Sequence, residues 1–116
     1  MADHHVLAGL FDPATFDTLK WQPFRLGVEI YPIHGSGDAT AAALLRYRKG
    51  AAVPRHFHPA HEHIVVLSGS QSDERGRYGA GTVVVNLPGT RHSVVSEEGC
   101  VVLAIWERPV VIEDGA

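Results

Sequence analysis

The sequence predicts an all-β protein, a small sandwich or barrel, and two observations support this fold class. Short apolar runs rich in Val, Ile and Leu alternate with turns that contain Gly, Pro or Asp. These runs suggest about six or seven strands, and at most one segment has the signals of a helix start. The 116 residues have room for one domain with a buried core and no disulfide support.

Residues 1–20 are expected to form an N-terminal arm or a short helical turn. Pro13 follows Asp12, and proline suits the first position of a helix because no N–H donor is needed there. The same segment could instead lie across a neighbouring molecule. Residues 21–112 are assigned to the single domain, and residues 113–116 to a polar tail.

Two segments of the first half are predicted as strands. Residues 26–34 alternate in polarity, but Pro32 cannot donate a ladder hydrogen bond and indicates an edge position or a bulge. Residues 39–48 suit a helix or a strand by composition, and their shortness and flanking turns favour a strand. One face of this strand, which carries either Leu45 or Leu44, should line the barrel.

Five side chains are candidates for the lining of a pocket, and the sequence leaves open which of them lie there. Arg46 and Arg48 share one face of the predicted strand, and either could bind a carboxylate at the mouth of the barrel. The simpler interpretation for each arginine is a position facing solvent. Tyr47, Tyr78 and Trp106 could contribute to the pocket, although packing in the core would explain these aromatic residues equally well.

The second half of the chain continues the strand pattern. Residues 70–78 are polar and carry charges of both signs, so we expect a hairpin connection on the surface with Asp73 in its solvated tip. Residues 83–85 are three consecutive valines, which predicts a strand covered on both faces. Residues 100–107 form the most apolar predicted strand, in which Cys100 is expected to be a small buried residue.

A metal site is indicated within and after residues 50–69. In an extended strand, residues two apart point to the same side, so His56 and His58 can reach one ion. A bend after them brings Glu62 beside the imidazoles, and His92 follows one hairpin later. Neutral imidazoles with one carboxylate suit zinc, iron, nickel or copper and leave open coordination positions.

Two more histidines flank this carboxylate. His61 and His63 each lie one residue from Glu62, so in a strand they point to the opposite side, and we expect both outside the barrel. The alternative for either histidine is to support the metal ligands or to contact a second subunit.

These residues also match two short motifs of the cupin superfamily. The first motif, G(X)5HXH(X)3,4E(X)6G, is filled at every fixed position by Gly50, His56, His58, Glu62 and Gly69. The second motif, G(X)5PXG(X)2H(X)3N, is filled by Gly81, Gly89 and His92. This chain departs from the second motif at two turn positions, where Leu87 replaces Pro and Ser96 replaces Asn. Neither departure affects the candidate ligand.

The segment SDERGRYGAGTVVVNLPGTRHSVVSEEGC also resembles the cupin domain of the ChrR type, the zinc-binding half of an anti-sigma factor. This resemblance covers roughly residues 21–107. It implies a small jelly-roll β-barrel. It also implies that the metal ligands are His56, His58, Glu62 and His92.

Composition limits the classes of binding partner and the cellular compartment that we expect for this protein. Thirteen acidic residues against ten Lys and Arg give a net charge of −3, so neither nucleic acid nor an anionic membrane is expected to bind. A small-molecule ligand or substrate is expected instead. The single cysteine excludes an internal disulfide and favours the cytoplasm, and no apolar run or signal peptide contradicts that location.

Three functions fit this chain at the level of sequence. The first is a metal-dependent enzyme, of dioxygenase or isomerase type, that acts on a small oxygen-rich molecule and in which Glu62 could be catalytic. The second is a zinc-binding sensor or regulatory module of the ChrR type, without catalysis. The third is a purely structural metal site. Zinc and iron are favoured, while nickel, manganese and copper are left open.

Assembly is predicted from the same family resemblance. Cupins associate through outer strands, so a homodimer is expected, with residues 11–16 or 110–112 as candidate contacts. A sigma factor is expected to be an unlikely partner. The reason is that the family binds sigma through a separate N-terminal zinc domain, and residues 1–20 contain no cysteine for such a domain.

Overall fold

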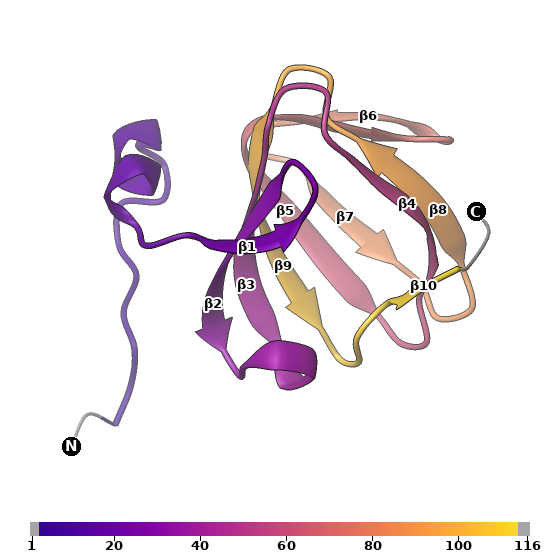
Figure 1. Ribbon diagram of the computed structural model, residues 1–116, viewed down its shortest axis with the longest axis horizontal. Coiled ribbons are helices and arrows are strands. Elements are labelled where there is room, and N and C mark those ends of the chain that lie inside the picture. The colour runs from indigo at the N-terminus through magenta and orange to yellow at the C-terminus, as the bar shows by residue number, and fades with distance from the viewer. Residues whose placement is uncertain (1–2, 114–116) are drawn as a thin grey trace.

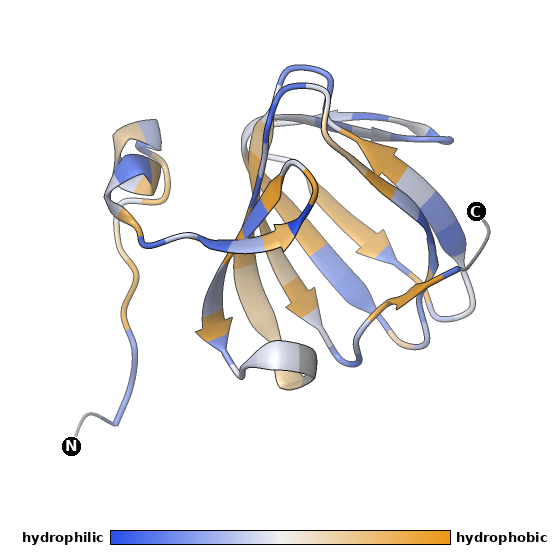
Figure 2. Cartoon of the chain, in the orientation of Figure 1, coloured by the Kyte–Doolittle hydropathy of each residue, from blue (hydrophilic) through white to orange (hydrophobic). Residues whose placement is uncertain are grey.

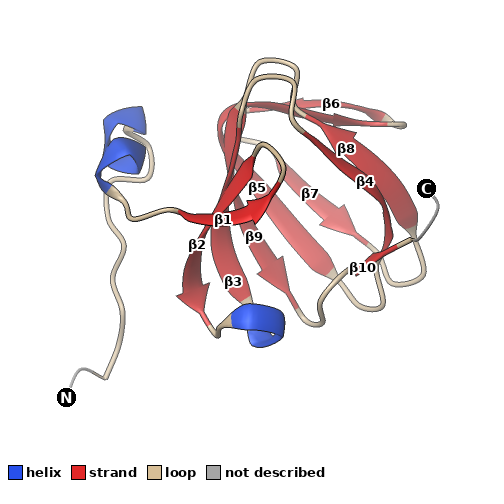
Figure 3. Cartoon of the chain, viewed as in Figure 1, coloured by secondary structure: helices blue, strands red, loops and turns tan. Residues whose placement is uncertain are grey.

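The structure, a computed structural model, describes residues 3–113, and strands form most of it (Figures 1 and 3). Two short 3-10 helices lie outside the sheets: η1 (Pro13–Thr18) and η2 (Gly37–Ala39). The strands are β1 (Gln22–Arg25), β2 (Val28–His34), β3 (Ala42–Tyr47), β4 (Ala52–Phe57), β5 (Glu62–Asp73), β6 (Gly76–Gly79), β7 (Val83–Asn86), β8 (Arg91–Val95), β9 (Cys100–Trp106) and β10 (Val111–Ile112). The prediction of an all-β protein is confirmed.

The strands pair antiparallel throughout and form two sheets that curl around one interior (Figure 1). One sheet contains β1, β2, β3, β9, β5 and β7. The other contains β10, β4, β8 and β6, together with the last part of β5. This arrangement is the small jelly-roll barrel that the motifs imply. In the part of the chain that the structure describes, no helix is long and apolar enough to span a bilayer.

Strand β5 belongs to both sheets and changes from one to the other at Gly69. Up to this glycine β5 pairs with β9, and beyond it with β6, while Ser72 also pairs with Val95 of β8. Gly69 has a φ of 73°, and a Cβ atom there would lie 1.9 Å from the carbonyl oxygen of Gly99. Only glycine fits this position. The second half of β5 therefore crosses to the sheet that contains β8.

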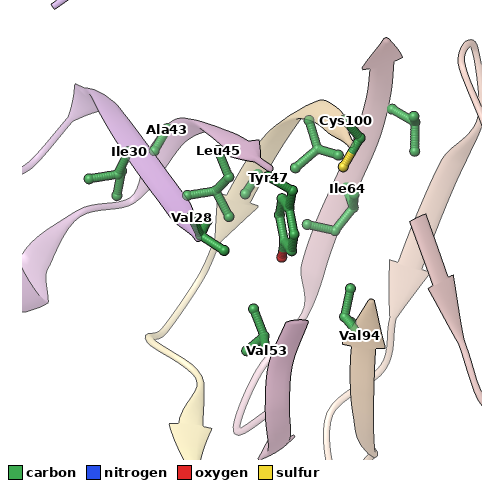
Figure 4. Close-up of a cluster of buried hydrophobic side chains, with 12 residues drawn as sticks. Val28, Ile30, Ala43, Leu45, Tyr47, Val53, Ile64, Val94 and Cys100 are labelled. Atoms are coloured by element: carbon green, nitrogen blue, oxygen red, sulfur yellow. The ribbon is translucent and has the colours of Figure 1, made fainter. Parts of the chain in front are cut away.

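The interior of the barrel is an apolar core around Tyr47, whose ring points between the two sheets (Figure 4). Leu45 and Tyr47 lie on the inner face of β3, so the prediction that one face of this strand lines the barrel is confirmed. Burial of the Tyr47 ring raises the pKa of its hydroxyl far above the ordinary value. Cys100 is buried in the same core, as predicted.

A second group of apolar side chains covers the outer face of the sheet, and we call it the outer apolar cluster. Its buried members are Phe16 of η1, Leu44 of β3 and Val101 of β9. The helical turn η1 begins where predicted, because Asp12 caps it by accepting a hydrogen bond from the Ala14 backbone N–H at 3.0 Å. Figure 2 shows hydrophobic stretches, in orange, in this N-terminal segment, which lies to one side of the barrel.

Three local predictions need correction or refinement. Pro32 does mark a bulge in the pairing of β2 with β3, but β2 is not an edge strand, because β1 pairs with its other side. The valine strand β7 is covered on one face only: Val83 and Val85 are 57% and 45% exposed. Residues 70–78 do form a hairpin with an exposed turn at Glu74 and Arg75, but most of them belong to its strands, β5 and β6, and not to a surface connection.

Candidate metal centre

The four candidate ligands come together in the interior, and we call them the histidine cluster. His56 lies near the end of β4 and pairs with His92 of β8. His58 follows β4 directly, and Glu62 is the first residue of β5. One donor atom from each of the four lies within 4.8 Å of all the others. All four residues are buried, and His58 is completely inaccessible. The cluster has the donor set and the spacing to hold one metal ion.

Each imidazole of the cluster donates a hydrogen bond from Nδ1 to an oxygen that can only accept. His56 Nδ1 lies 2.9 Å from the carbonyl oxygen of Pro54, and His58 Nδ1 lies 3.2 Å from that of Thr90. His92 Nδ1 lies 3.0 Å from the Asp73 carboxylate. The proton of each neutral ring must therefore be on Nδ1, which leaves Nε2 with a free lone pair.

No donor among the described residues reaches two of these lone pairs. The Nε2 atoms of His58 and His92 are buried without a hydrogen-bond partner among the described residues. His58 Nε2 lies only 3.3 Å from Glu62 Oε1, so an acceptor nitrogen faces an acceptor oxygen. A bound cation would turn this unfavourable contact into two ligand bonds. The structure therefore fits a metal, and the ligand assignment itself stays a prediction.

The carboxylate of Glu62 is held by two neighbouring strands. Asn86 of β7 donates to Oε1 at 2.8 Å, and Trp106 of β9 donates to Oε2 at 2.5 Å. Burial alone would raise the pKa of Glu62, but the nearby His58 imidazole and the hydrogen bonds from Trp106 and Asn86 outweigh it and leave the pKa below its usual range. The carboxylate is thus ionised, as a metal ligand must be.

Burial has the opposite consequence for the imidazole of His56, because it disfavours the charged form. The pKa of His56 is lowered, mainly by loss of solvent and only partly opposed by the Pro54 carbonyl. The neighbouring imidazole of His92, whose ring centre is 4.6 Å away, lowers the His56 pKa further. The neutral imidazole is the metal-binding form, so the lowered pKa of His56 favours metal binding at neutral pH.

Asp73 is a site residue that the sequence prediction missed. It was assigned to a solvated hairpin tip, yet its side chain is only 3% exposed and accepts the Nδ1 proton of His92. Tyr78 and the backbone N–H of Arg75 also donate to it. Although desolvation raises the pKa of Asp73, the hydrogen bonds from His92, Arg75 and Tyr78 outweigh it and lower the pKa. The miss follows from the sheet change of β5, which no local pattern reveals.

A cavity of about 40 Å³ opens beside the histidine cluster. Tyr47 and Trp106, two of the five pocket candidates, line it. Arg46 does not, because it lies on the outer face, where its Nη2 is 2.9 Å from Glu29 and its guanidinium stacks on Trp21.

The other pocket candidates lie elsewhere in the part of the chain that the structure describes. Arg48 is exposed outside the cavity, and Tyr78 binds Asp73 instead of lining the cavity. The arginine that does line the cavity is Arg25 of β1, which sequence reasoning did not select. No sequence signal distinguishes it, because β1 is a short strand with mostly exposed residues.

The two histidines that flank Glu62 lie outside the cluster, as expected. His61 pairs with Glu107 at 3.0 Å on the surface, and its ring stacks on that of His63. Cys100, predicted to be structural, is buried in the core, and loss of solvent raises the pKa of its thiol to about 11. A thiol with this pKa is a poor nucleophile at neutral pH.

Comparison with known proteins identifies the family. The model of the ChrR Cupin-like domain matches residues 13–109 of this chain. The chain belongs to this family. The anti-sigma-E factor ChrR of Cereibacter sphaeroides is 33% identical over 96 residues, which are 81% of this chain and 45% of ChrR. The chain thus spans about half the length of ChrR.

Solved structures give the same fold. In the crystal structure of Rhodobacter sphaeroides SigE in complex with the anti-sigma ChrR, the matching chain is 32% identical, with a TM-score of 0.70. The match covers 78% of this chain and 51% of that one. An acetylacetone dioxygenase from Acinetobacter johnsonii shares the fold at 16% identity and a TM-score of 0.72, covering 98% of this chain and 80% of the dioxygenase.

The prediction that a sigma factor is an unlikely partner is wrong. ChrR is an anti-sigma factor, and its solved structure contains SigE. The prediction relied on the composition of residues 1–20. That segment does not decide which proteins the surface of a cupin domain contacts, so its composition could not support the exclusion.

Proposed function

We propose that this ChrR-like cupin is a metal-dependent enzyme that acts on a small oxygen-rich molecule by a dioxygenase or isomerase type of reaction. The observation that carries the proposal is the convergence of Nε2 lone pairs and a carboxylate oxygen beside an apolar cavity. His56, His58, Glu62 and His92 would hold the ion. Zinc and iron are the favoured ions, and either would polarise a carbonyl or enol oxygen of the substrate.

The chain's own side chains would organise the reaction around that ion. Leu45, Ile64 and Val94 line the cavity and exclude water from it. Trp106 and Asn86 fix the orientation of Glu62 by donating to its two oxygens. Glu62 is the candidate proton carrier because its carboxylate is ionised and can accept a proton, although its lowered pKa makes it a weak base.

Elemental analysis of protein purified without a histidine tag or chelator tests the metal centre. We expect one ion per chain in the wild type and none in Glu62→Ala. The matched control is His63→Ala, because His63 is adjacent in sequence but lies outside the cluster and should leave the metal content unchanged. Absence of metal from the wild type would contradict the proposal.

Turnover is tested separately from metal content. Iron-loaded protein is screened for oxygen uptake with chelating diketones and phenols, and zinc-loaded protein for isomerisation of the same compounds. We expect Glu62→Gln to lower turnover even where metal is retained. Unchanged metal content and unchanged turnover in this variant would remove Glu62 from the mechanism. Metal without any ligand binding would indicate a structural site.

A second function is favoured by the ChrR similarity: a zinc-binding regulatory module without catalysis. The relevant observation is that ChrR, 33% identical to this chain, is an anti-sigma factor. The test is co-purification of a sigma factor with the untagged protein from its native host, with and without metal. Metal-dependent recovery of a sigma factor, together with no turnover, would favour the regulatory module over the enzyme.

We also propose that the protein is a homodimer. Val83, Val85 and Ile105 are 43% to 57% exposed and lie on β7 and β9, the two strands that flank β5. Contact between such faces would bury this apolar surface. Sizing by light scattering should give twice the monomer mass, and a monomer mass at micromolar concentration would contradict the dimer.

A further inference from the structure

The cavity beside the histidine cluster has one side chain with a permanent positive charge, Arg25 at the end of β1. The rest of the lining is mainly apolar, with Leu45, Ile64 and Val94 among it. The carboxylate in the lining, Glu62, is already bound by its neighbours. A half-buried guanidinium in such a place has a desolvation cost that a bound anion would offset.

Arg25 also differs from most other arginines of the chain in having no anionic partner. Arg46, Arg77 and Arg91 each lie within 3.0 Å of a carboxylate oxygen. No carboxylate lies within ion-pair distance of Arg25 in residues 3–113, and its guanidinium instead rests 5.2 Å from the ring centre of Phe24. Its five N–H donors are available for a ligand.

Arg25 lies between the inner cavity and an adjoining hollow, because it lines both. It lines the inner cavity together with His56 and Glu62, and it also lines an adjoining hollow with Thr40 and Pro109. Phe24, Arg25, Trp106 and Val110 are shared by the two. A ligand that enters the cavity through this hollow passes the guanidinium. The inner cavity is small, so a ligand of only a few carbons could contact both the guanidinium of Arg25 and the histidine cluster.

We propose that the ligand of this site is a small carboxylate that carries a second oxygen donor, and that Arg25 is the residue that selects it. This inference rests on the proposed metal-dependent function. The second oxygen would face the histidine cluster, the short carbon chain would lie against the apolar walls, and the carboxylate would accept paired hydrogen bonds from Arg25.

The test compares two probes that differ by one carboxylate: pentane-2,4-dione, which is neutral, and 2,4-dioxopentanoate. Their dissociation constants are measured by calorimetry on zinc-loaded protein at pH 7. We expect the acid to bind wild type about 10- to 100-fold more tightly than the dione, the range of a charge-assisted hydrogen bond. Arg25→Gln should reduce this ratio to about 3-fold or less and leave the dione affinity unchanged.

Two controls keep the outcome specific. Arg48→Gln removes the same charge from an exposed position outside the cavity and should keep the wild-type ratio. Zinc content after each titration shows that neither probe has removed the metal. Two results would overturn the role of Arg25: a dione-to-acid ratio of dissociation constants near one in wild type, or the wild-type ratio retained in Arg25→Gln. In either case, zinc-dependent binding of the dione would still support the metal site. Failure of both probes to bind zinc-loaded protein would count against both proposals.

Discussion

The outer apolar cluster and the histidine cluster are equally buried but chemically opposite. In the outer apolar cluster, Leu44 is fully buried against Phe16 and Val101, and these side chains have no polar atoms that need a partner. In the histidine cluster, three imidazoles lie with ring centres 4.6 to 5.1 Å apart, and two of them have unpartnered Nε2 atoms. The first arrangement stabilises the fold, whereas the second reduces stability until a ligand binds. Stability and ligand binding should therefore be separable by mutation.

The largest expected effect is on metal affinity, in His58→Ala. This change removes a fully buried ligand whose Nε2 faces Glu62 at 3.3 Å. We expect metal affinity to fall by more than about 100-fold, beyond the loss typical of supporting residues. The unfolding free energy of the metal-free protein should change by about 1 kcal/mol or less, because lost packing is offset by removal of an unpartnered polar atom. Competition with a chelator and urea unfolding measure the two quantities.

The converse prediction concerns the outer apolar cluster. Leu44→Ala removes a fully buried side chain between η1 and the sheet. It should lower the unfolding free energy by about 2 to 5 kcal/mol, the range for such truncations. Metal content should stay at one ion per chain. A loss of metal from folded Leu44→Ala protein would show that the two clusters are coupled and would break the comparison.

Asp73→Asn sharpens the comparison within the histidine cluster itself. His92 is the one ring that donates to a carboxylate, while His56 and His58 donate to backbone carbonyls. Loss of that negative charge should weaken metal binding by about 10- to 100-fold, or about 1.4 to 2.8 kcal/mol. Thr90→Val is the matched control, because it removes only an uncharged hydroxyl, 3.1 Å from His58 Nδ1, while the Thr90 carbonyl that also accepts from this ring remains. Equal losses in both variants would mean that the carboxylate has no special role.

Much of the fold was predictable because it follows from local patterns. Alternating and β-branched runs predicted the strands, and Pro13 after Asp12 predicted the helical turn. The convergence of His56, His58, Glu62 and His92 was predictable because short spacings and one hairpin connect them. In these places neighbouring residues determine the geometry.

The remaining features depend on contacts between distant segments. Asp73 reaches His92 only because Gly69 lets β5 cross between sheets, and the polar sequence around Asp73 looks like a surface turn. Arg25 enters the cavity from a short edge strand whose position is fixed by its pairing with β2. Val83 and Val85 are exposed because no segment within residues 3–113 covers that face of β7, which composition cannot reveal. Tertiary packing decided each of these cases.

The smallest effect we predict is a change in how stability depends on pH in the metal-free protein. Burial lowers the pKa of His56 below about 6.5, its value in an unfolded chain. Between the two pKa values the folded state binds fewer protons than the unfolded state. The contribution of His56 to the unfolding free energy is therefore fully present above about pH 6.5. It is lost as the pH drops toward the lowered pKa, by at most about 1.4 kcal/mol per pH unit.

His56→Gln should flatten this dependence between about pH 7 and 5, as measured by urea unfolding, because the buried base that resists protonation is gone. Leu44→Ala should instead lower the curve at every pH and keep its slope, since no member of the outer apolar cluster titrates. Glu62 and Asp73 do not interfere in this range, because their pKa values lie below the ordinary carboxyl range. A wild-type slope in His56→Gln would mean that another group dominates, and the pH response could not then be assigned to the buried imidazole of the histidine cluster.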